Sequence, residues 1–323
     1  MPPISRRASA LARRLDRALD EMPGIQRLGE RLSHALHSWI LGGGERTRDL
    51  ADTLHGTWLG HPLHPLLTDI TIGAWTLAGG FDLIGVVSKD TFYRRVGDQL
   101  TMIGTASVIP TALAGLADYS TTPRPALPTA TLHGLTNLAG TSLYLVSIYH
   151  RRRGRRGRGL LFSTLGLTTL TVGAWLGGRL VYTEGVGVDH AEGFTEPEDW
   201  TELLPADDLV EGEPRCVEFE GNQVLLYREG QRIHAIGAVC SHAGAPLAEG
   251  TFAGSRVECP WHQSVFDLRD GSVIHGPATK AQPYFEARIR AGQVEIRLPR
   301  EEIPEVEVRE EGEDEAVLDA AAD

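Results

Sequence analysis

Four long apolar segments between residues 61 and 185 constrain this chain more than any other feature. They cover approximately residues 65–88, 99–117, 131–149 and 159–182. A helix needs about 20 apolar residues to cross about 30 Å of hydrocarbon. The segments therefore predict a four-helix transmembrane domain over residues 61–185. An even number of spans would place both chain ends on one side of the cell membrane.

A soluble four-helix bundle is the alternative interpretation of these segments. Soluble helices carry a polar face rich in Glu and Lys. The polar side chains here are mostly Thr, Ser and Asn, which suit helix contacts in lipid. Asp69 and Asp82 are costly in lipid unless they face the bundle interior. The tripeptide Gly-Ala-Trp occurs at 73–75 and at 173–175, which is too short to establish an internal repeat.

The region before this domain is polar. Residues 1–60 are rich in arginine and predict an amphipathic helix between Arg6 and Arg31, with one face formed by Leu11, Leu15 and Leu19. No apolar run of signal-peptide length follows the opening arginines. Arginines also crowd residues 150–158, and the positive-inside rule would place that connection in the cytoplasm. The arginines near the start argue for the opposite orientation, so the sequence leaves the side of the membrane undetermined.

The last third of the chain has the character of a soluble protein. A polar linker is expected over residues 186–208. Short β-rich runs follow it, at residues 215–219, 223–227 and 233–239. They predict an all-β domain over residues 209–300, so the chain as a whole is multi-domain. Residues 301–323 carry most of the net charge of −12 and predict a disordered acidic tail. No nucleic-acid partner is expected.

Two short motifs in the β region bring metal-binding residues together. The first is Cys240-Ser241-His242, and the second is Cys259-Pro260-Trp261-His262. Thiolates are soft ligands that suit iron–sulfur centres, and neutral imidazole binds iron through nitrogen. A tetrahedral zinc ion is the alternative, because two Cys and two His also suit zinc. The chain has three cysteines in all, which argues against a disulfide framework.

The residues around these motifs resemble the Rieske ferredoxin family. Cys240 to Gly244 is similar to the family's first cluster loop, residues 259–271 are similar to the second, and Gly276-Pro277-Ala278 resembles its proline loop. The resemblance covers about residues 200–300 and implies a [2Fe-2S] cluster. Its implied ligands are Cys240 and Cys259 on one iron, and His242 and His262 on the other, solvent-facing iron. The resemblance also implies that Ser264, Phe266 and Pro277 lie around the cluster.

Three departures from the family pattern bear on the cluster. In the cytochrome bc branch each loop carries an extra Cys and the two form a disulfide. Ala245 and Trp261 stand in those places, so that disulfide is absent. Phe266 replaces the Tyr that accompanies the Ser264 position, so we expect a reduction potential within the family's range of about −150 to +300 mV and not near its top. Gln263 replaces the usual Gly after the second His ligand.

Other reactive side chains in the β region have ordinary explanations. Cys216 lies in a predicted strand and is expected to be a buried, inert thiol. His234 and His275 are expected to be ordinary surface or strand residues.

Polar residues also gather at one end of the predicted bundle. His61 and His64 open the first segment, Asp118 closes the second, and His133 opens the third. Because successive helices alternate in direction, these ends share one face, from which the β domain also leaves. The residues could bind a haem or a second metal ion, or simply cap helix ends. With its His-Pro-Leu-His-Pro start, this domain also resembles an uncharacterised family of four-helix bacterial membrane domains, which implies no activity.

The leading hypothesis for function is a membrane-anchored one-electron carrier. It would work between a membrane or quinone-linked redox partner and a second redox protein, with the lipid bilayer holding its anchor. The alternative is a Rieske-dependent oxygenase or oxidoreductase. That enzyme would need a mononuclear iron held by two His and a carboxylate, such as His61, His64 and Asp69 or Asp118. A redox sensor is a third hypothesis, although no output domain is visible.

Overall fold

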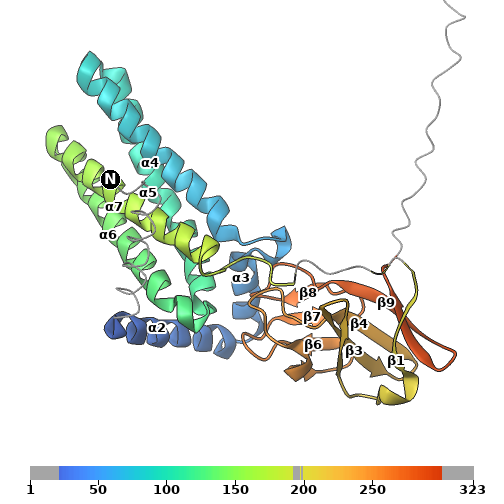
Figure 1. Ribbon diagram of the computed structural model, residues 1–323. Helices are drawn as coiled ribbons and strands as arrows, with labels where there is room; N and C mark the ends of the chain where they lie inside the picture. Colours follow the sequence, from blue (N-terminus) through green and yellow to red (C-terminus); the bar gives the residue numbers. More distant parts are fainter. Residues whose placement is uncertain (1–21, 192–196, 198, 300–323) are drawn as a thin grey trace, which may run out of the picture.

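The computed structural model describes residues 22–191, 197 and 199–299. A helical part comes first and a β domain follows it, and the two lie in contact (Figure 1). This arrangement confirms the prediction of a helical region followed by an all-β domain. The predicted helix face of Leu11, Leu15 and Leu19, and the acidic tail at 301–323, lie outside the described residues.

Six α-helices make up the described helical part. They are α2 (Pro23–Gly42), α3 (Glu45–His55), α4 (Leu63–Ser88), α5 (Thr91–Ser120), α6 (Leu127–Arg152) and α7 (Arg156–Tyr182). By length and composition, α4, α5 and α7 are apolar enough to cross a membrane. The helix α6 is of similar length but does not meet this criterion, since Thr, Ser, Asn and His interrupt it. Three candidate spans are therefore established, where four were predicted.

The second helix of the bundle is longer than its apolar segment. It begins at Thr91 and not near Gln99, because the side chain of Asp90 caps it by accepting a hydrogen bond from the Phe92 N–H (2.8 Å). Its first turns carry Arg94 and Asp98, charged residues that hydropathy alone assigns to a loop. Both side chains are held by partners on other helices or turns.

The four long helices form two hairpins, α4–α5 and α6–α7, that repeat the same design. Three pairs of side chains meet between α4 and α6, at equal spacing on both helices: His64 with His133, Trp75 with Tyr144, and Asp82 with Arg151. Each of these six side chains packs against a glycine of its own hairpin, either Gly97, Gly104 and Gly115 on α5 or Gly159, Gly166 and Gly177 on α7. The repeated Gly-Ala-Trp tripeptide has no part in this repeat, since Trp75 is buried and Trp175 is exposed.

Buried ion pairs close the end of the hairpins that lies away from the β domain (Figure 1). Arg151 contacts Asp82 and Asp98, and Arg156 contacts the same two carboxylates, with N–O distances of 2.7 Å. The side chains of Arg151 and Asp82 are 5% and 7% exposed. Asp82 thus faces the interior, as its cost in lipid requires. Asp69, in contrast, is exposed.

The helices α2 and α3 pack across the opposite end, beside the β domain (Figure 1). Ser33 on α2 donates from Oγ to the Ser120 carbonyl (3.0 Å), and the Tyr119 hydroxyl donates to the Gly29 carbonyl (3.3 Å). Gly29 allows this approach, because a Cβ there would lie 2.6 Å from Thr131 Oγ1. The described part of the polar N-terminal region, residues 22–60, therefore belongs to the folded helical unit.

The β domain consists of two antiparallel sheets. Six strands form the larger sheet, in the order β1 (Thr201–Pro205), β10 (Gln293–Arg297), β9 (Tyr284–Arg290), β4 (Arg232–Gly237), β3 (Asn222–Glu229) and β2 (Arg215–Phe219). The smaller sheet contains β5 (Thr251–Phe252), β6 (Arg256–Glu258), β7 (Val265–Asp267) and β8 (Val273–His275). β1 lies inside the expected linker and pairs with β10, so β structure begins before residue 209.

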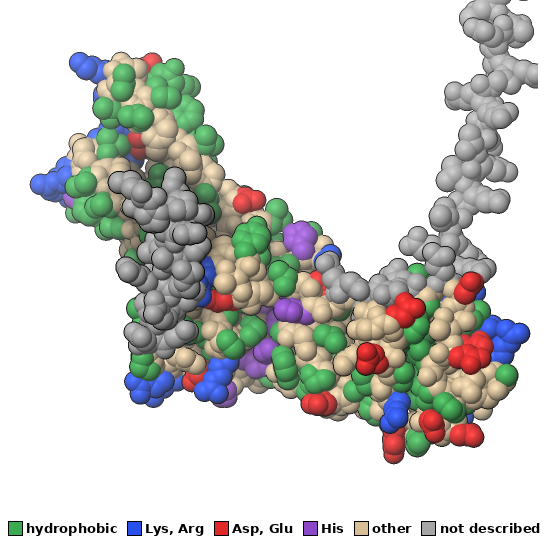
Figure 2. All heavy atoms as spheres, viewed as in Figure 1, with side chains coloured by type: hydrophobic (Ala, Val, Ile, Leu, Met, Phe, Trp, Pro, Cys, Tyr) green, Lys and Arg blue, Asp and Glu red, His purple; other side chains and the backbone are tan. Residues whose placement is uncertain are grey.

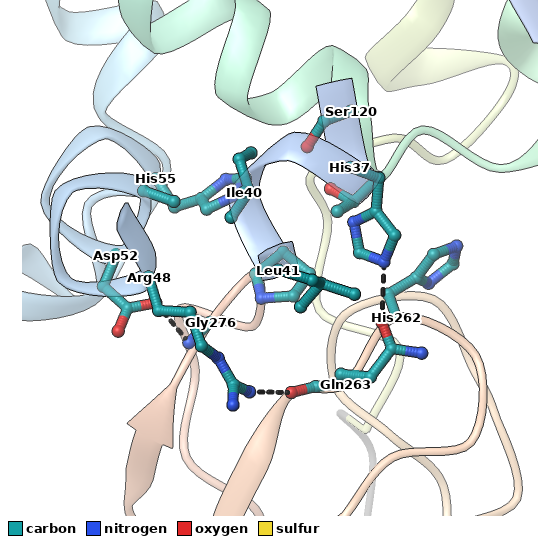
Figure 3. Close-up of a pocket in the computed structure, with 13 residues that line it drawn as sticks. His37, Ile40, Leu41, Arg48, Asp52, His55, Ser120, His262, Gln263 and Gly276 are labelled. Carbon is teal, nitrogen blue, oxygen red and sulfur yellow. Dashed lines mark hydrogen bonds between the residues drawn. The ribbon is translucent and has the colours of Figure 1, made fainter. Parts of the chain in front are cut away.

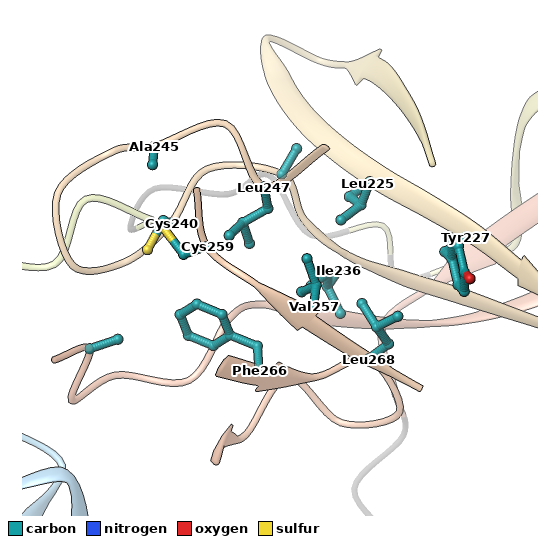
Figure 4. Close-up of a cluster of buried hydrophobic side chains, with 12 residues drawn as sticks. Leu225, Tyr227, Ile236, Cys240, Ala245, Leu247, Val257, Cys259, Phe266 and Leu268 are labelled. Atoms are coloured by element: carbon teal, nitrogen blue, oxygen red, sulfur yellow. The ribbon is translucent and has the colours of Figure 1, made fainter. Parts of the chain in front are cut away.

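Two buried clusters hold the β domain together. One contains Leu225, Ile236, Leu247, Val257 and Phe266 together with Cys240 and Cys259, whose sulfur atoms lie at its edge (Figure 4). The other lies under β1, β9 and β10 and contains Leu204, Leu226, Phe285, Val294 and Ile296. The candidate ligand loops are thus anchored on a packed core by their own cysteines.

We expect Asp82→Ala to destabilise the helical part by about 3–5 kcal/mol, because it leaves the buried Arg151 guanidinium without one of its two carboxylates. The measurement is the thermal unfolding midpoint of the purified full chain in detergent. Arg155→Ala is the matched control, since Arg155 is an exposed residue of the same connection. Equal midpoints for the two variants would contradict the structural role of the ion pairs.

Candidate metal centre

Two loops with the same backbone design present the four candidate ligands. The first loop follows β4 and carries Cys240, and the second joins β6 to β7 and carries Cys259. The N–H of Cys240 donates to Ala245 O (2.8 Å), and the N–H of Gly244 donates to Cys240 O (2.9 Å). The second loop repeats both bonds, from Cys259 N–H to Ser264 O (2.8 Å) and from Gln263 N–H to Cys259 O (3.2 Å).

The residue four positions after each cysteine adopts a left-handed backbone. Gly244 has φ 77° and Gln263 has φ 57°. Glycine takes this conformation at no steric cost, whereas another L-residue loses about 1–2 kcal/mol. The substitution of Gln for the family's usual Gly therefore keeps the loop conformation, at an energetic cost. The side chain of Gln263 has contacts that offset this cost, as described below.

Both cysteines are suited to act as thiolate ligands. They are buried and free of disulfides. A hydrogen bond with Cys259, together with burial, raises the pKa of the Cys240 thiol, and the same hydrogen bond lowers the pKa of Cys259 to about 7. Backbone N–H groups of His242 and Ala243 stabilise the Cys240 thiolate, and those of Trp261 and His262 stabilise the Cys259 thiolate. Each sulfur thus meets two backbone donors, which favour negative charge on it.

Both histidines are held in the neutral form that binds metals. Burial, followed by the charge of His37, lowers the pKa of His262 to about 4, and burial lowers the pKa of His242 well below its ordinary value. Nδ1 of His262 is buried without a hydrogen-bond partner. A buried nitrogen with no partner is costly unless it binds something. This unpaired atom fits a metal ligand.

The spacing of the four donors distinguishes a cluster from a single ion. Zinc holds its ligand atoms about 2.0–2.3 Å from its centre, so all of them lie close together. In the described part of the chain, three such donor atoms come within 4.8 Å of one another only at Asp49, Asp52 and His275. No three of the motif residues do so. The arrangement therefore suits two irons better than one zinc.

The predicted surroundings of the cluster are found beside these loops. Ser264 is fully buried, and its Oγ accepts a hydrogen bond from the Ala278 N–H (3.0 Å). Its own hydroxyl hydrogen remains available to a sulfide. Phe266 is also fully buried and belongs to the core cluster that contains both cysteines. Pro277 lines a cavity on the other side of His262.

The histidine edge of the site faces the helical part and not open solvent. A cavity of about 20 Å³ separates His262 from α2, α3 and the end of α5, which is room for about one water molecule (Figure 3). Both His242 and His262 are half-buried. The titratable side chains that interact electrostatically with His242 are His262, His55 and His190. The N-terminal helices therefore lie next to the histidine edge, which the resemblance alone placed toward solvent.

Side chains of α2 and α3 fasten the β domain in this position (Figure 3). His37 donates from Nε2 to Gln263 Oε1 (2.6 Å), and Arg48 donates to the Gln263 carbonyl (3.3 Å). Asp52 accepts from His275 Nδ1 and from the Gly276 N–H, both at 2.8 Å. His275 is therefore an interdomain contact and not an ordinary surface residue.

Sequence reasoning missed these α3 residues, although a signal was present. Arg48, Asp52 and His55 are spaced by four and three residues, which places them on one face of a helix. That spacing could have indicated a polar face with a partner. The partner itself is more than 200 residues away in the chain, and no local pattern identifies it.

The candidate residues at the bundle end separate into different environments. Asp118 accepts a hydrogen bond from His55 Nδ1 (2.8 Å). His61 is exposed and donates only to the adjacent Pro62 carbonyl (3.0 Å). His64 and His133 face each other with ring centroids 6.2 Å apart. Histidines gather on the surface where the helical part meets the β domain (Figure 2). Two of the four predicted residues thus form a pair, and the other two do not join it.

The structure corrects the prediction for Cys216 and places His234 in a strand, one of its two predicted environments. Cys216 lies on β2 as predicted, but it is exposed and not buried. Its strand is at the edge of the sheet, and its side chain points to the outer face. His234 on β4 is buried, with Nε2 3.3 Å from Glu229 Oε2.

Comparisons with known proteins agree with this geometry. Residues 60–190 match the family described as "Predicted membrane protein (DUF2231)", and residues 199–286 match the Rieske [2Fe-2S] domain. The chain is 31% identical over 99 residues to the ferredoxin component of the naphthalene 1,2-dioxygenase system of Pseudomonas putida, which is 31% of this chain and 95% of that protein. It is 33% identical over 110 residues to apoptosis-inducing factor 3 of Mus musculus, covering 33% of this chain and only 18% of that protein.

Among solved structures, the ferredoxin of carbazole 1,9a-dioxygenase from Nocardioides aromaticivorans IC177 is 27% identical. The match covers 32% of this chain and 100% of that ferredoxin, with a TM-score of 0.30.

The β domain therefore defines an iron–sulfur protein of the Rieske class. The chain belongs to the Rieske [2Fe-2S] family, and in front of its Rieske domain it carries a domain of the predicted membrane protein family DUF2231. The cofactor of such a domain is a [2Fe-2S] cluster.

We expect Cys259→Ser to abolish the cluster, because hydroxyl oxygen is a poor ligand for iron compared with thiolate. The measurements are non-haem iron content, expected to fall from about two per chain, and the electron paramagnetic resonance signal of the reduced protein. Cys216→Ser is the matched control and should leave both unchanged, since Cys216 is exposed on β2. An unaltered signal in Cys259→Ser would refute the ligand assignment.

We expect Ser264→Ala to lower the reduction potential by on the order of 60 mV. For a one-electron couple, this shift is a tenfold change in the equilibrium constant between the oxidised and reduced states. The reason is that a hydrogen bond to a cluster sulfur stabilises the reduced, more negative state. Redox titration of the purified protein measures this. Ser255→Ala, in the turn between β5 and β6, provides the control. A potential that rises or stays the same in Ser264→Ala would contradict a hydrogen bond to sulfide.

Proposed function

We propose that this protein is a membrane-anchored one-electron carrier, with Cys240, Cys259, His242 and His262 as cluster ligands. The observation that carries the proposal is the position of the histidine edge, which lies against the helical part beside His55 and His37. A Rieske cluster supplies one reversible electron. The covered edge supports electron exchange on the side of the membrane domain.

The proposal includes four membrane spans. The helix α6 joins α4, α5 and α7 because its Tyr144 stacks on Trp75 of α4 at 4.1 Å between ring centroids. Large apolar side chains on the outer surfaces of all four helices are exposed, among them Leu77, Ile109, Leu138 and Leu161. A lipid environment explains such a surface. Four spans would leave α2 and the Rieske domain on one side, where the structure has both.

The second partner is proposed to be a soluble redox protein. The ferredoxin components among the relatives belong to dioxygenase systems, and by analogy this domain would pass electrons to an acceptor protein. Trp261 supports a docking point for such a partner. It is 51% exposed and adjoins His262, with ring centroids 6.5 Å apart.

A quinol is the proposed donor in the membrane, and the docked position of the Rieske domain is proposed to be needed for its reaction. The double substitution Arg48→Ala with Asp52→Ala removes contacts to Gln263, His275 and Gly276. We expect cluster reduction by an added quinol to slow about tenfold or more, because these contacts would no longer hold the Rieske domain against the helical part. A tenfold change in rate corresponds to about 1.4 kcal/mol of activation free energy. The measurement is stopped-flow bleaching of the oxidised cluster in membranes.

Two comparisons make this experiment specific. Reduction by dithionite, a small soluble reductant, should be unchanged in the double variant. Glu45→Ala is the control substitution, because Glu45 is an exposed carboxylate in the first turn of the same helix. If quinol fails to bleach the cluster of the unaltered protein, quinol is not the donor. Equal quinol rates in both proteins would show that docking is not needed.

A further inference from the structure

The two histidines that face each other at the end of the bundle have no role in the Rieske site. His64 lies in the first turn of α4 and His133 in the second turn of α6, so they belong to different hairpins of the internal repeat. Their ring centroids are 6.2 Å apart. A metal about 2.0–2.1 Å from each coordinating nitrogen would fit between two rings at this separation.

Each ring is fixed in the same way by the partner helix of its own hairpin. His64 donates from Nδ1 to the Thr111 carbonyl of α5 (2.9 Å), and His133 donates from Nδ1 to the Gly173 carbonyl of α7 (2.8 Å). A histidine that binds metal through one nitrogen almost always donates the other N–H to a carbonyl, carboxylate or water, which fixes its tautomer. Both rings therefore carry their lone pair on Nε2.

A glycine provides space for each ring. A Cβ at Gly115 would lie 2.8 Å from His64 Cε1, and one at Gly177 would lie 3.1 Å from His133 Cε1. Any larger residue would displace the imidazole. The same combination of histidine, carbonyl and glycine thus occurs twice, once in the α4–α5 hairpin and once in the α6–α7 hairpin.

The one polar neighbour of this pair does not occupy the free lone pair. The amide nitrogen of Asn137 lies 3.0 Å from Nε2 and 3.4 Å from Nδ1 of His133. The two lone-pair directions of an imidazole diverge, so an atom this close to both nitrogens lies beside the ring. It is not in line with Nε2.

We propose that His64 and His133 are the two axial ligands of a haem iron held between the hairpins. A porphyrin supplies four nitrogens, so two imidazoles complete the coordination of its iron. A bare metal ion needs a third or fourth protein donor. In the part of the chain that the structure describes, these two histidines belong to no group of three His, Cys, Asp or Glu donors that all lie within 4.8 Å of one another.

The position of this site relates it to the cluster. Gly115, which contacts His64, is one turn before Asp118, and Asp118 accepts the hydrogen bond of His55. His55 in turn interacts electrostatically with His242. The haem would therefore lie beneath the histidine edge of the Rieske site. The proposal does not depend on a quinol donor or on a soluble acceptor.

The experiment uses the full chain, expressed with added haem precursor and purified in detergent. The expected result is a Soret band, with one haem b per chain by the pyridine haemochrome assay. His64→Ala and His133→Ala should each lose this band while keeping the electron paramagnetic resonance signal of the reduced cluster. That signal shows that the variant has folded. His61→Ala is the matched control and should keep both, because His61 is an exposed histidine of the same His-Pro-Leu-His-Pro motif.

Three results would overturn the haem site. One is the absence of a Soret band in protein that holds its cluster, even after incubation with hemin. Another is an unchanged band in both His64→Ala and His133→Ala. The third is copper or zinc, found by metal analysis and lost in the same two variants. Because the cluster is read by a separate signal, none of these outcomes bears on the Rieske site.

Discussion

The carboxylate of Asp52 joins the two halves of the molecule. One of its oxygens accepts from His275 and the other from the Gly276 backbone, so a single side chain of α3 holds the loop that precedes Pro277. His37 and Arg48 donate hydrogen bonds to the second ligand loop at Gln263. These contacts decide which way the site faces. Without them the histidine ligands would open to solvent, as expected of a free ferredoxin-like domain.

The strained backbone at Gln263 is best understood from this interface. Glycine at that position would relieve the left-handed conformation, but it would remove the side-chain oxygen that His37 contacts. A hydrogen bond of this kind contributes about 0.5–1.5 kcal/mol, comparable to the conformational cost of about 1–2 kcal/mol. Gln263 therefore makes the loop less stable than Gly would, but its side chain attaches the loop to His37 of the helical part.

Local patterns predicted the parts of the fold that local physics controls. Apolar runs located all four long helices, although hydropathy missed the first turns of α5, whose charges are stabilised by other helices. The β-rich runs located β2, β3 and β4, and the two Cys–His motifs located the site because ligand chemistry restricts residue type. The covering of the site, the exposure of Cys216 and the pairing of His55 with Asp118 depend on contacts between distant segments. A single sequence contains no local signal for those contacts.

The two hairpins are held together at both ends. Ion pairs among Asp82, Asp98, Arg151 and Arg156 and the stacked Trp75 and Tyr144 hold them together away from the Rieske domain. At the end beside the Rieske domain, α2 packs across the hairpins, and the Tyr119 hydroxyl of α5 shares a hydrogen bond of 2.8 Å with Thr131 Oγ1 of α6. A haem between His64 and His133 would therefore be enclosed from both ends, and it would have to enter before α2, α3 and the β domain close over it.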